Sequence, residues 1–259
     1  MTDPVVIAVA NQKGGVGKTT TAVNLGAELA ERGNPTLIID LDPQGNASTG
    51  VGCPVKGRGA TSYDVLSGRY GLNDARTRTS VDNLSLVPST PDLSSGDIDF
   101  ANRPDRIRLL KAAIDQVGDQ KFILIDCPPA LGLLTVNALV AADSVLVPLQ
   151  AEFYALEGLS QLLMTVREVR QGANPDLRLD GVVLTMYDGR NNLSQQVEAD
   201  ARATLGELVY ETMIPRNVRI SEAPSHGLPV TKYDPASTGS RAYQALASEF
   251  LKRQKDMKQ

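Results

Sequence analysis

Short apolar runs alternate along the chain with longer stretches of helical spacing. Runs rich in Val, Ile and Leu are too short for buried helices and predict strands at 5–10, 36–40, 84–88, 122–126, 144–149 and 179–186. A further short strand is expected at 207–214. Apolar positions 107, 109, 110, 113, 114 and 117 recur as on one face of a helix. Comparable stretches predict helices at 22–32, 106–117, 133–142, 156–171, 192–206 and 238–255.

Two stretches between these elements show no such pattern. Residues 43–62 are rich in Gly, Asn, Ser and Pro, the residues of turns, so we expect a loop there, followed by a short helix from Tyr63. Residues 88–104 are mostly polar, and we expect an irregular segment.

The alternation of strands and helices predicts an α/β fold with a mostly parallel, twisted sheet and helices on both faces. We find no internal repeat, low-complexity segment or linker in the sequence. We therefore expect a single domain spanning residues 1–259.

The composition indicates which residues fill the core and argues against cysteine-based sites and membrane spans. Hydrophobic residues make up 42% of the chain, but aromatic residues only 4%, with no Trp, so Val, Leu, Ile and Ala must fill the core. Cys53 and Cys127 lack the spacing of a metal site or a disulfide framework. There is no apolar run of about 18 residues and no charged-then-apolar leader, so we expect a soluble cytoplasmic protein without membrane partners.

The net charge of −4 argues against general affinity for nucleic acid. The charge is unevenly distributed, however, because residues 201–259 carry nine Lys and Arg against six Asp and Glu. Any contact with DNA is therefore expected to be local and to lie in the C-terminal part.

Residues 11–20 read Asn-Gln-Lys-Gly-Gly-Val-Gly-Lys-Thr-Thr and stand between a predicted strand and a predicted helix. This is the context of a phosphate-binding loop, in which glycines let backbone N–H groups surround a polyphosphate. Gln12 replaces the usual first glycine, and Lys13 is an additional lysine. Lys18 is expected at the β- and γ-phosphates and Thr19 at Mg²⁺. The nucleotide is expected to contact Lys13, Gly14, Gly15, Val16, Gly17, Lys18, Thr19 and Thr20.

Carboxylates stand at the ends of two predicted strands. Asp126 ends an apolar strand, as a Walker B aspartate does, and is expected to hold Mg²⁺ directly or through water. Asp40 and Asp42 lie two residues apart at another strand end. Ligands of open α/β sheets bind beyond the carboxyl ends of strands, so these groups are expected to meet the phosphate loop. Hydrolysis needs a group that orients or deprotonates a water, and Asp42 is our candidate.

The phosphate loop, together with Asp-Leu-Asp-Pro-Gln-Gly-Asn at 40–46, resembles the deviant Walker A motif of the ParA/MinD ATPases. The resemblance is strongest to the partition branch, ParA and Soj, and covers nearly the whole chain. It implies ATP and Mg²⁺ as cofactors and Asp42 as the residue that activates water. It also implies that Asp40 serves the water shell of the metal and that residues 44–46 form a switch sensitive to the γ-phosphate.

The resemblance also implies assembly. Lys13 matches a lysine that reaches the partner's phosphates in a nucleotide-sandwich homodimer and so acts in trans. With Asp42 and Lys18, it completes the expected catalytic residues. Glu152 matches a position that can reach the ribose across that dimer. Pro215 and Asn217 match the segment that binds the base.

Basic residues near the C-terminus match positions that contact DNA phosphates in the partition branch: Arg190, Arg219 and, as an extension, Arg216. Only ten residues precede Asn11, so we expect no N-terminal helix-turn-helix and no sequence-specific recognition. The resemblance thus implies a weak, partner-stimulated ATPase of chromosome or plasmid partition. Its ATP dimer would bind non-specific double-stranded DNA on the nucleoid, and a ParB-like protein would release it.

Three alternatives share the phosphate loop. A MinD-like, membrane-associated cell-division ATPase needs a C-terminal amphipathic helix, whereas residues 252–259 are almost wholly polar. A metabolic ligase resembling dethiobiotin synthetase needs a small-molecule pocket that nothing in the sequence marks. A reductase resembling the nitrogenase iron protein needs paired cysteines at a dimer seam, and Cys53 and Cys127 do not match that pattern.

Overall fold

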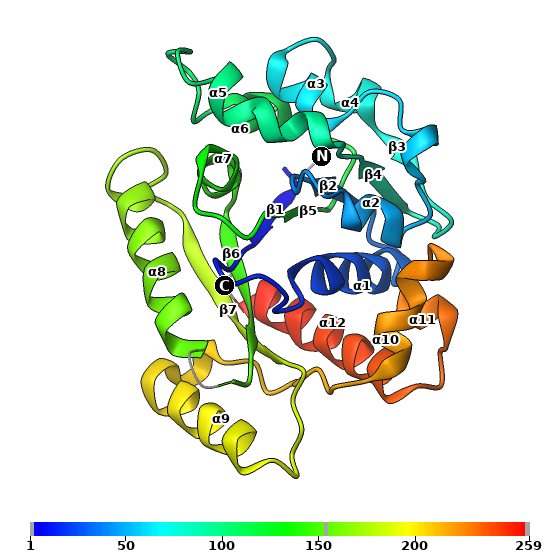
Figure 1. The fold of residues 1–259 in the computed structure, drawn as a ribbon, viewed down its shortest axis with the longest axis vertical. Coiled ribbons are helices and arrows are strands. Elements are labelled where there is room, and N and C mark those ends of the chain that lie inside the picture. Colours follow the sequence, from blue (N-terminus) through cyan, green and yellow to red (C-terminus); the bar gives the residue numbers. More distant parts are fainter. Residues whose placement is uncertain (1–2, 153–154, 257–259) are drawn as a thin grey trace.

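The strands form one seven-stranded sheet in the computed structural model, which describes residues 3–152 and 155–256. The strand order is β3-β4-β2-β5-β1-β6-β7 (Figure 1). Neighbouring strands are parallel, except that β3 runs antiparallel to β4. The strands are β1 (Val5–Val9), β2 (Thr36–Asp40), β3 (Thr77–Arg78), β4 (Leu84–Val87), β5 (Phe122–Asp126), β6 (Ser144–Gln150) and β7 (Arg178–Thr185).

Helices connect the strands and cover the sheet. They are α1 (Lys18–Glu31), α2 (Asn46–Gly50), α3 (Ser62–Ser67), α4 (Leu72–Ala75), α5 (Gly96–Asp99), α6 (Leu109–Ile114), α7 (Leu133–Ala141), α8 (Ala155–Gln171), α9 (Asn192–Leu205), α10 (Val218–Glu222), α11 (Val230–Tyr233) and α12 (Thr238–Asp256). Short 3-10 turns lie at Val55–Gly57, Pro91–Ser95, Gly206–Leu208 and Ala223–His226. Within the described part of the chain, every helix is too short or too polar to cross a lipid bilayer.

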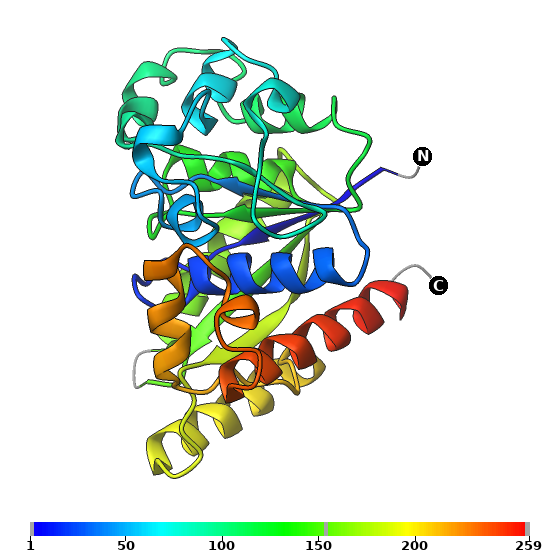
Figure 2. The same ribbon diagram turned by 90° about the vertical axis from the view of Figure 1, so that its right-hand side faces the viewer.

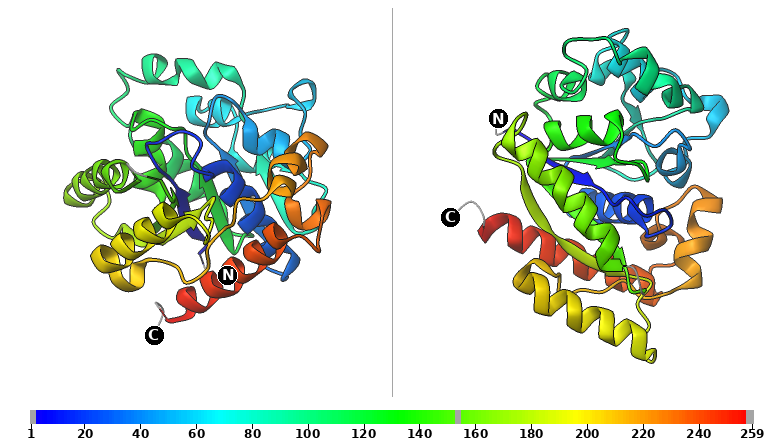
Figure 3. Two further views of the ribbon diagram at one scale, coloured as in Figure 1. Left: turned by 60° about the horizontal axis from the view of Figure 1, so that its bottom comes forward. Right: turned by 60° about the vertical axis from the view of Figure 1, so that its left-hand side comes forward.

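The sheet buries side chains on both faces, which explains why its strands read as continuous apolar runs. In β5, Ile123 and Ile125 pack with α6, α7 and α8, whereas Phe122 and Leu124 pack with α1 and α12 on the opposite face. Figure 2 shows α1 and α12 side by side on their face, and Figure 3 shows α8 on the other. The predicted α/β architecture is confirmed.

The strand expected at 207–214 is wrong. This segment makes only isolated bridges, Val182 to Val209 and Tyr187 to Pro215, beside β7. Between these bridges, the backbone N–H groups of Glu211 and Thr212 donate to the Glu249 carboxylate, both at 2.9 Å. The Tyr210 and Ile214 N–H groups still donate to β7, at the Val182 and Leu184 carbonyls, so the side chain of α12 interrupts the pairing between them.

The loop expected at 43–62 and the irregular segment at 88–104 contain more structure than we predicted. The first holds α2 and a 3-10 turn, and the second holds a 3-10 turn and α5. The expected helix at 106–117 is shorter, since α6 covers only Leu109–Ile114. The short elements β3, α4, α10 and α11 were not predicted at all. They are too brief to carry a periodic pattern, and tertiary contacts hold them.

Candidate nucleotide-binding site

The phosphate loop follows β1 and leads directly into α1, at the carboxyl edge of the sheet. Gly15 (φ 75°) and Gly17 (φ 86°) adopt left-handed backbone conformations that side chains with a Cβ disfavour. Gly17 is the N-cap of α1 and offers no side-chain cap, so the first N–H groups of this helix remain available to an anion. The sequence-predicted turn, Gly14 to Gly17, therefore forms as expected.

Neighbouring strand ends shape this loop. The Thr185 hydroxyl, at the end of β7, donates to the Val16 carbonyl at 2.8 Å. The Asn11 amide donates to the Pro148 carbonyl at 2.8 Å and accepts from the Lys13 N–H at 3.0 Å. We did not single out Thr185, because nothing local in the sequence links it to a loop so far away along the chain.

Lys18 lies under the loop with only 6% of its surface exposed. Its ammonium donates to the Lys13 carbonyl at 2.9 Å. Burial lowers the pKa of Lys18, whereas the nearby carboxylate of Asp126 raises it. A buried cation without a directly bonded carboxylate is suited to bind the oxygens of a polyphosphate.

Asp40 and Asp126 face each other as register partners at the ends of β2 and β5. Both are fully buried. Burial raises the pKa of Asp40 to about 6 although the Ser48 hydroxyl and N–H both bond its carboxylate, at 2.6 and 2.8 Å. Burial also raises the pKa of Asp126 well above its ordinary value, and Asp40 adds to that rise.

The Asp126 carboxylate fits a metal ligand. Both of its oxygens are buried without a hydrogen-bond partner among the described residues, which is unusual for a charged group. The Thr19 hydroxyl lies close enough to oppose the rise in the pKa of Asp126, although it makes no hydrogen bond of normal geometry with either oxygen. No group of three His, Cys, Asp or Glu residues in the described ranges could hold a metal alone. That agrees with Mg²⁺, which binds one or two protein oxygens together with phosphate and water.

Asp42 begins a tight turn beside these carboxylates and is 8% exposed. One of its oxygens accepts the Gln44 N–H at 2.9 Å, and its carbonyl accepts the Gly45 N–H at 2.9 Å. The other carboxylate oxygen has no partner within the described part of the chain. The structure thus brings Asp40, Asp42 and Asp126 together, as we expected from their positions at strand ends.

A pocket of about 560 Å³ opens beside the phosphate loop. Its lining includes Gly17, Thr20, Thr185, Pro215 and Asn217. The Asn217 amide is the N-cap of α10 and also donates to another side chain, so only one of its N–H bonds and part of its oxygen remain for a base. The structure therefore places the predicted base-binding segment beside the phosphate loop but gives Asn217 a structural role as well.

Lys13 and Glu152 pair with each other in this chain. The Lys13 ammonium lies 3.1 Å from a Glu152 oxygen, and the Gln150 amide donates to the second oxygen. Both side chains are partly exposed, at 38% and 45%. The two residues that we expected to act across a dimer are thus neighbours within one chain.

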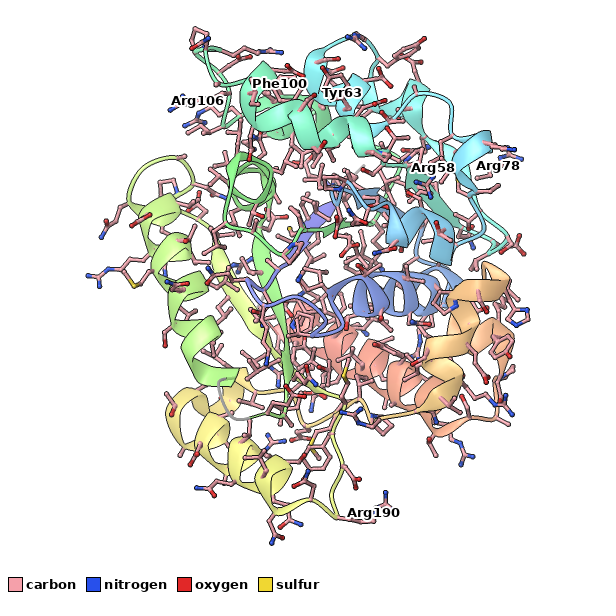
Figure 4. All side chains as sticks on the ribbon, viewed as in Figure 1. Arg58, Tyr63, Arg78, Phe100, Arg106 and Arg190 are labelled. Atoms are coloured by element: carbon pink, nitrogen blue, oxygen red, sulfur yellow. The ribbon has the colours of Figure 1, made fainter. Side chains whose placement is uncertain are left out.

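The three arginines expected at DNA lie in two segments, the loop before α9 and the chain from Arg216 into α10. Arg190 pairs with Asp188 at 3.0 Å at the tip of the loop before α9 (Figure 4), and its side chain is 92% exposed. The Arg216 N–H donates to the Tyr187 carbonyl, which brings these two segments together. Arg219 lies in α10, three residues beyond Arg216, and this helix packs against α11 and α12. There, Glu222 and Asp234 contact its guanidinium at 2.7 and 3.3 Å.

Known proteins resemble this chain over nearly its full length. The family described as AAA domain matches residues 5–179. The chain is 54% identical over 254 residues to the chromosome partitioning protein ParA of Caulobacter vibrioides, covering 97% of this chain and 95% of that protein. It is 51% identical over 249 residues to the chromosome-partitioning ATPase Soj of Thermus thermophilus, covering 95% of each.

A solved structure shows the same architecture with a nucleotide bound. It is that of cobyrinic acid a,c-diamide synthase from Mycobacterium smegmatis, with a bound ATP analogue and magnesium. The match has a TM-score of 0.85 and 38% sequence identity, and covers 97% of this chain and 96% of that one.

Proposed function

Because the chain belongs to the ParA/MinD family of P-loop ATPases, we propose that it is a DNA-partitioning ATPase that binds ATP with Mg²⁺ and hydrolyses it slowly. The observation that carries this proposal is the buried, unpartnered carboxylate of Asp126 beside the phosphate loop. Such a group is costly unless a ligand completes it, and a divalent cation held by phosphates would do so.

The geometry supports separate roles for the site residues in binding phosphate, metal and water. Lys18 and the loop from Gly14 to Thr20 would bind the phosphates, while Thr19 and Asp126 would hold Mg²⁺, with Asp40 at its water shell. Mg²⁺ would neutralise charge that develops on the transferred phosphoryl group. The free oxygen of Asp42 would orient the attacking water, since a group in line with the γ-phosphate is what hydrolysis requires.

We further propose that ATP joins two chains. Lys13 and Glu152 are partly exposed at the rim of the site, where a second chain can reach them. In a sandwich dimer, Lys13 would leave Glu152 for the partner's phosphates, and Glu152 would be free to meet the partner's ribose. A cation delivered in trans would make hydrolysis depend on dimerisation.

The dimer would then bind double-stranded DNA through phosphate contacts of Arg190, Arg216 and Arg219. Two copies present twice the positive charge of one, so affinity rises on dimerisation without new base contacts. In this proposal, a ParB-like partner stimulates hydrolysis and thereby releases the dimer from DNA on the nucleoid, in the cytoplasm.

Binding to two unrelated duplexes, measured with ATP, with ADP and without nucleotide, tests the proposal. We expect binding to both duplexes with ATP and Mg²⁺ only, together with slow phosphate release. Lys18→Ala is the matched control, since it should abolish both activities by removing the buried phosphate-binding cation. Equal DNA binding in all three nucleotide conditions would contradict the switch, and absence of phosphate release would contradict the ATPase.

A further inference from the structure

Arg58 lies outside the motifs that mark the nucleotide site, yet its guanidinium contacts the segment that follows Asp42. Figure 4 shows Arg58 on the right-hand side of the molecule, near α2. Its Nη2 donates to the Gly45 carbonyl at 3.0 Å and to the Thr49 hydroxyl at 2.9 Å. Arg58 thus bonds the turn that Asp42 begins and the helix, α2, that follows this turn.

The same guanidinium ties that turn to the sheet. Nη1 donates to the Ser89 carbonyl, just beyond β4, at 2.6 Å, and Nε donates to the Cys53 carbonyl at 3.2 Å. No carboxylate forms an ion pair with Arg58 among residues 3–152 and 155–256. All five of its N–H bonds are directed by the rigid plane of the guanidinium, so a single side chain spans acceptors from three segments.

A second pair of contacts joins two of these segments, α2 and Ser89, to the predicted metal site. Ser48, in α2, donates through its hydroxyl to Asp40 and accepts the Ser89 N–H at 3.1 Å. Ser89 is therefore held through its N–H by Ser48 and through its carbonyl by Arg58. Both bonds fix the distance between the end of β4 and the turn that carries Asp42.

The turn packs tightly against Arg58 at Gly45. Gly45 has φ 63°, a left-handed conformation, and a Cβ at this position would overlap Arg58 Nη1 and lie 3.0 Å from the Ser89 carbonyl. Gly45 also supplies the N–H that the Asp42 carbonyl accepts. The position of the Asp42 backbone is thus coupled to the guanidinium through a single residue.

We propose that Arg58 is a positioning residue for ATP hydrolysis, which fixes the turn from Asp42 to Thr49 so that Asp42 meets the attacking water. This inference rests on the proposed function, because it assigns Asp42 to that water. Arg58 touches none of the phosphate-loop residues, so its loss should affect the chemical step more than nucleotide binding.

Replacing Arg58 tests this directly in the full-length chain. Misplacement of a reacting group by about 1 Å can cost about 100-fold in rate, so we expect Arg58→Ala to lower single-turnover hydrolysis by about 10- to 100-fold. Equilibrium binding of a fluorescent ATP analogue should stay within about twofold of wild type, because Lys18 and the loop remain intact. Arg58→Lys keeps the charge but not the planar fork, and we expect an intermediate rate.

Arg69→Ala is the matched control. The Arg69 side chain is 62% exposed, makes a long ion pair with Asp64 at 3.4 Å and lies 5.4 Å from the centre of the Tyr63 ring. None of these groups belongs to the nucleotide site, so the removal of Arg69 should leave both rate and affinity unchanged. If Arg58→Ala fails to fold, Arg58→Lys decides the question. A wild-type rate in Arg58→Lys, or equal losses of rate and nucleotide affinity, would overturn the inference. A wild-type chain that hydrolyses no ATP would instead refute the proposed function, and this inference with it.

Discussion

Asp126→Asn should stabilise the ligand-free protein, although most changes at a buried site destabilise. The wild-type carboxylate is fully buried, has no hydrogen-bond partner within the described residues and lies beside Asp40. An unsatisfied buried polar group costs about 1 to 3 kcal/mol. Asparagine has nearly the same shape, carries no charge and brings N–H donors toward the Asp40 carboxylate.

The expected gain is therefore about 1 to 3 kcal/mol in the free energy of unfolding, or about 2 to 10 °C in Tm for a chain of this size. The gain should grow as the pH rises. Because the pKa of Asp126 is raised in the folded state, the folded protein holds a proton that the unfolded chain has lost, so wild-type stability falls with increasing pH. The amide side chain of the Asp126→Asn variant does not titrate, so the substitution removes this part of the pH dependence.

Thermal unfolding with and without ATP, in Mg²⁺ and in EDTA, measures both halves of the prediction. ATP at 100 times its Kd should stabilise the wild type by about 2.7 kcal/mol. If Asp126 holds the metal, the Mg²⁺-dependent part of that shift should disappear in Asp126→Asn. A lower Tm of the variant without ligand would refute the cost assigned to the unpartnered carboxylate, and a full Mg²⁺-dependent shift in the variant would refute Asp126 as a metal ligand.

Four further predictions address separate residues. Asp42→Ala should keep ATP binding but stop hydrolysis and trap the dimer, seen by size exclusion with ATP and Mg²⁺; normal hydrolysis would instead make Asp40 the candidate. Lys13→Ala should bind nucleotide as a monomer but lose ATP-dependent dimerisation. A variant that dimerises normally would show that Lys13 is only a solvent-exposed surface lysine. Arg219→Ala removes two phosphate contacts from a dimer, so the slope of log affinity against log salt should flatten by about 2 on each of two unrelated duplexes. An unchanged slope would show that Arg219 does not contact DNA. Burial raises the pKa of Asp180 to about 6, so the free energy of unfolding falls as the pH rises from about 4 to 6. Asp180→Asn should remove up to about 3 kcal/mol of that fall, measured by urea unfolding across this pH range, and an unchanged pH dependence would contradict it.

Local sequence determined the phosphate loop and the long elements around it. The glycines of residues 14–17 need no distant contact to favour a tight turn. An apolar run such as 122–126 can bury the side chains of both its faces only between two layers of helices. The place of Asp126 at the carboxyl edge of a parallel sheet could be predicted from sequence because it ends such a run.

Tertiary structure decided the features that depend on pairing between distant residues. The Glu249 carboxylate accepts the N–H groups of Glu211 and Thr212, and the segment in which the sequence favoured a strand bonds to β7 only on either side of them. Thr185 reaches the phosphate loop only because β7 ends beside it, and Arg58 meets Ser89 only because β4 and α2 are neighbours. Hydrogen bonds of this kind join residues far apart in the chain, so no periodicity or local motif encodes them. Their geometry exists only once the sheet has brought its strand ends together.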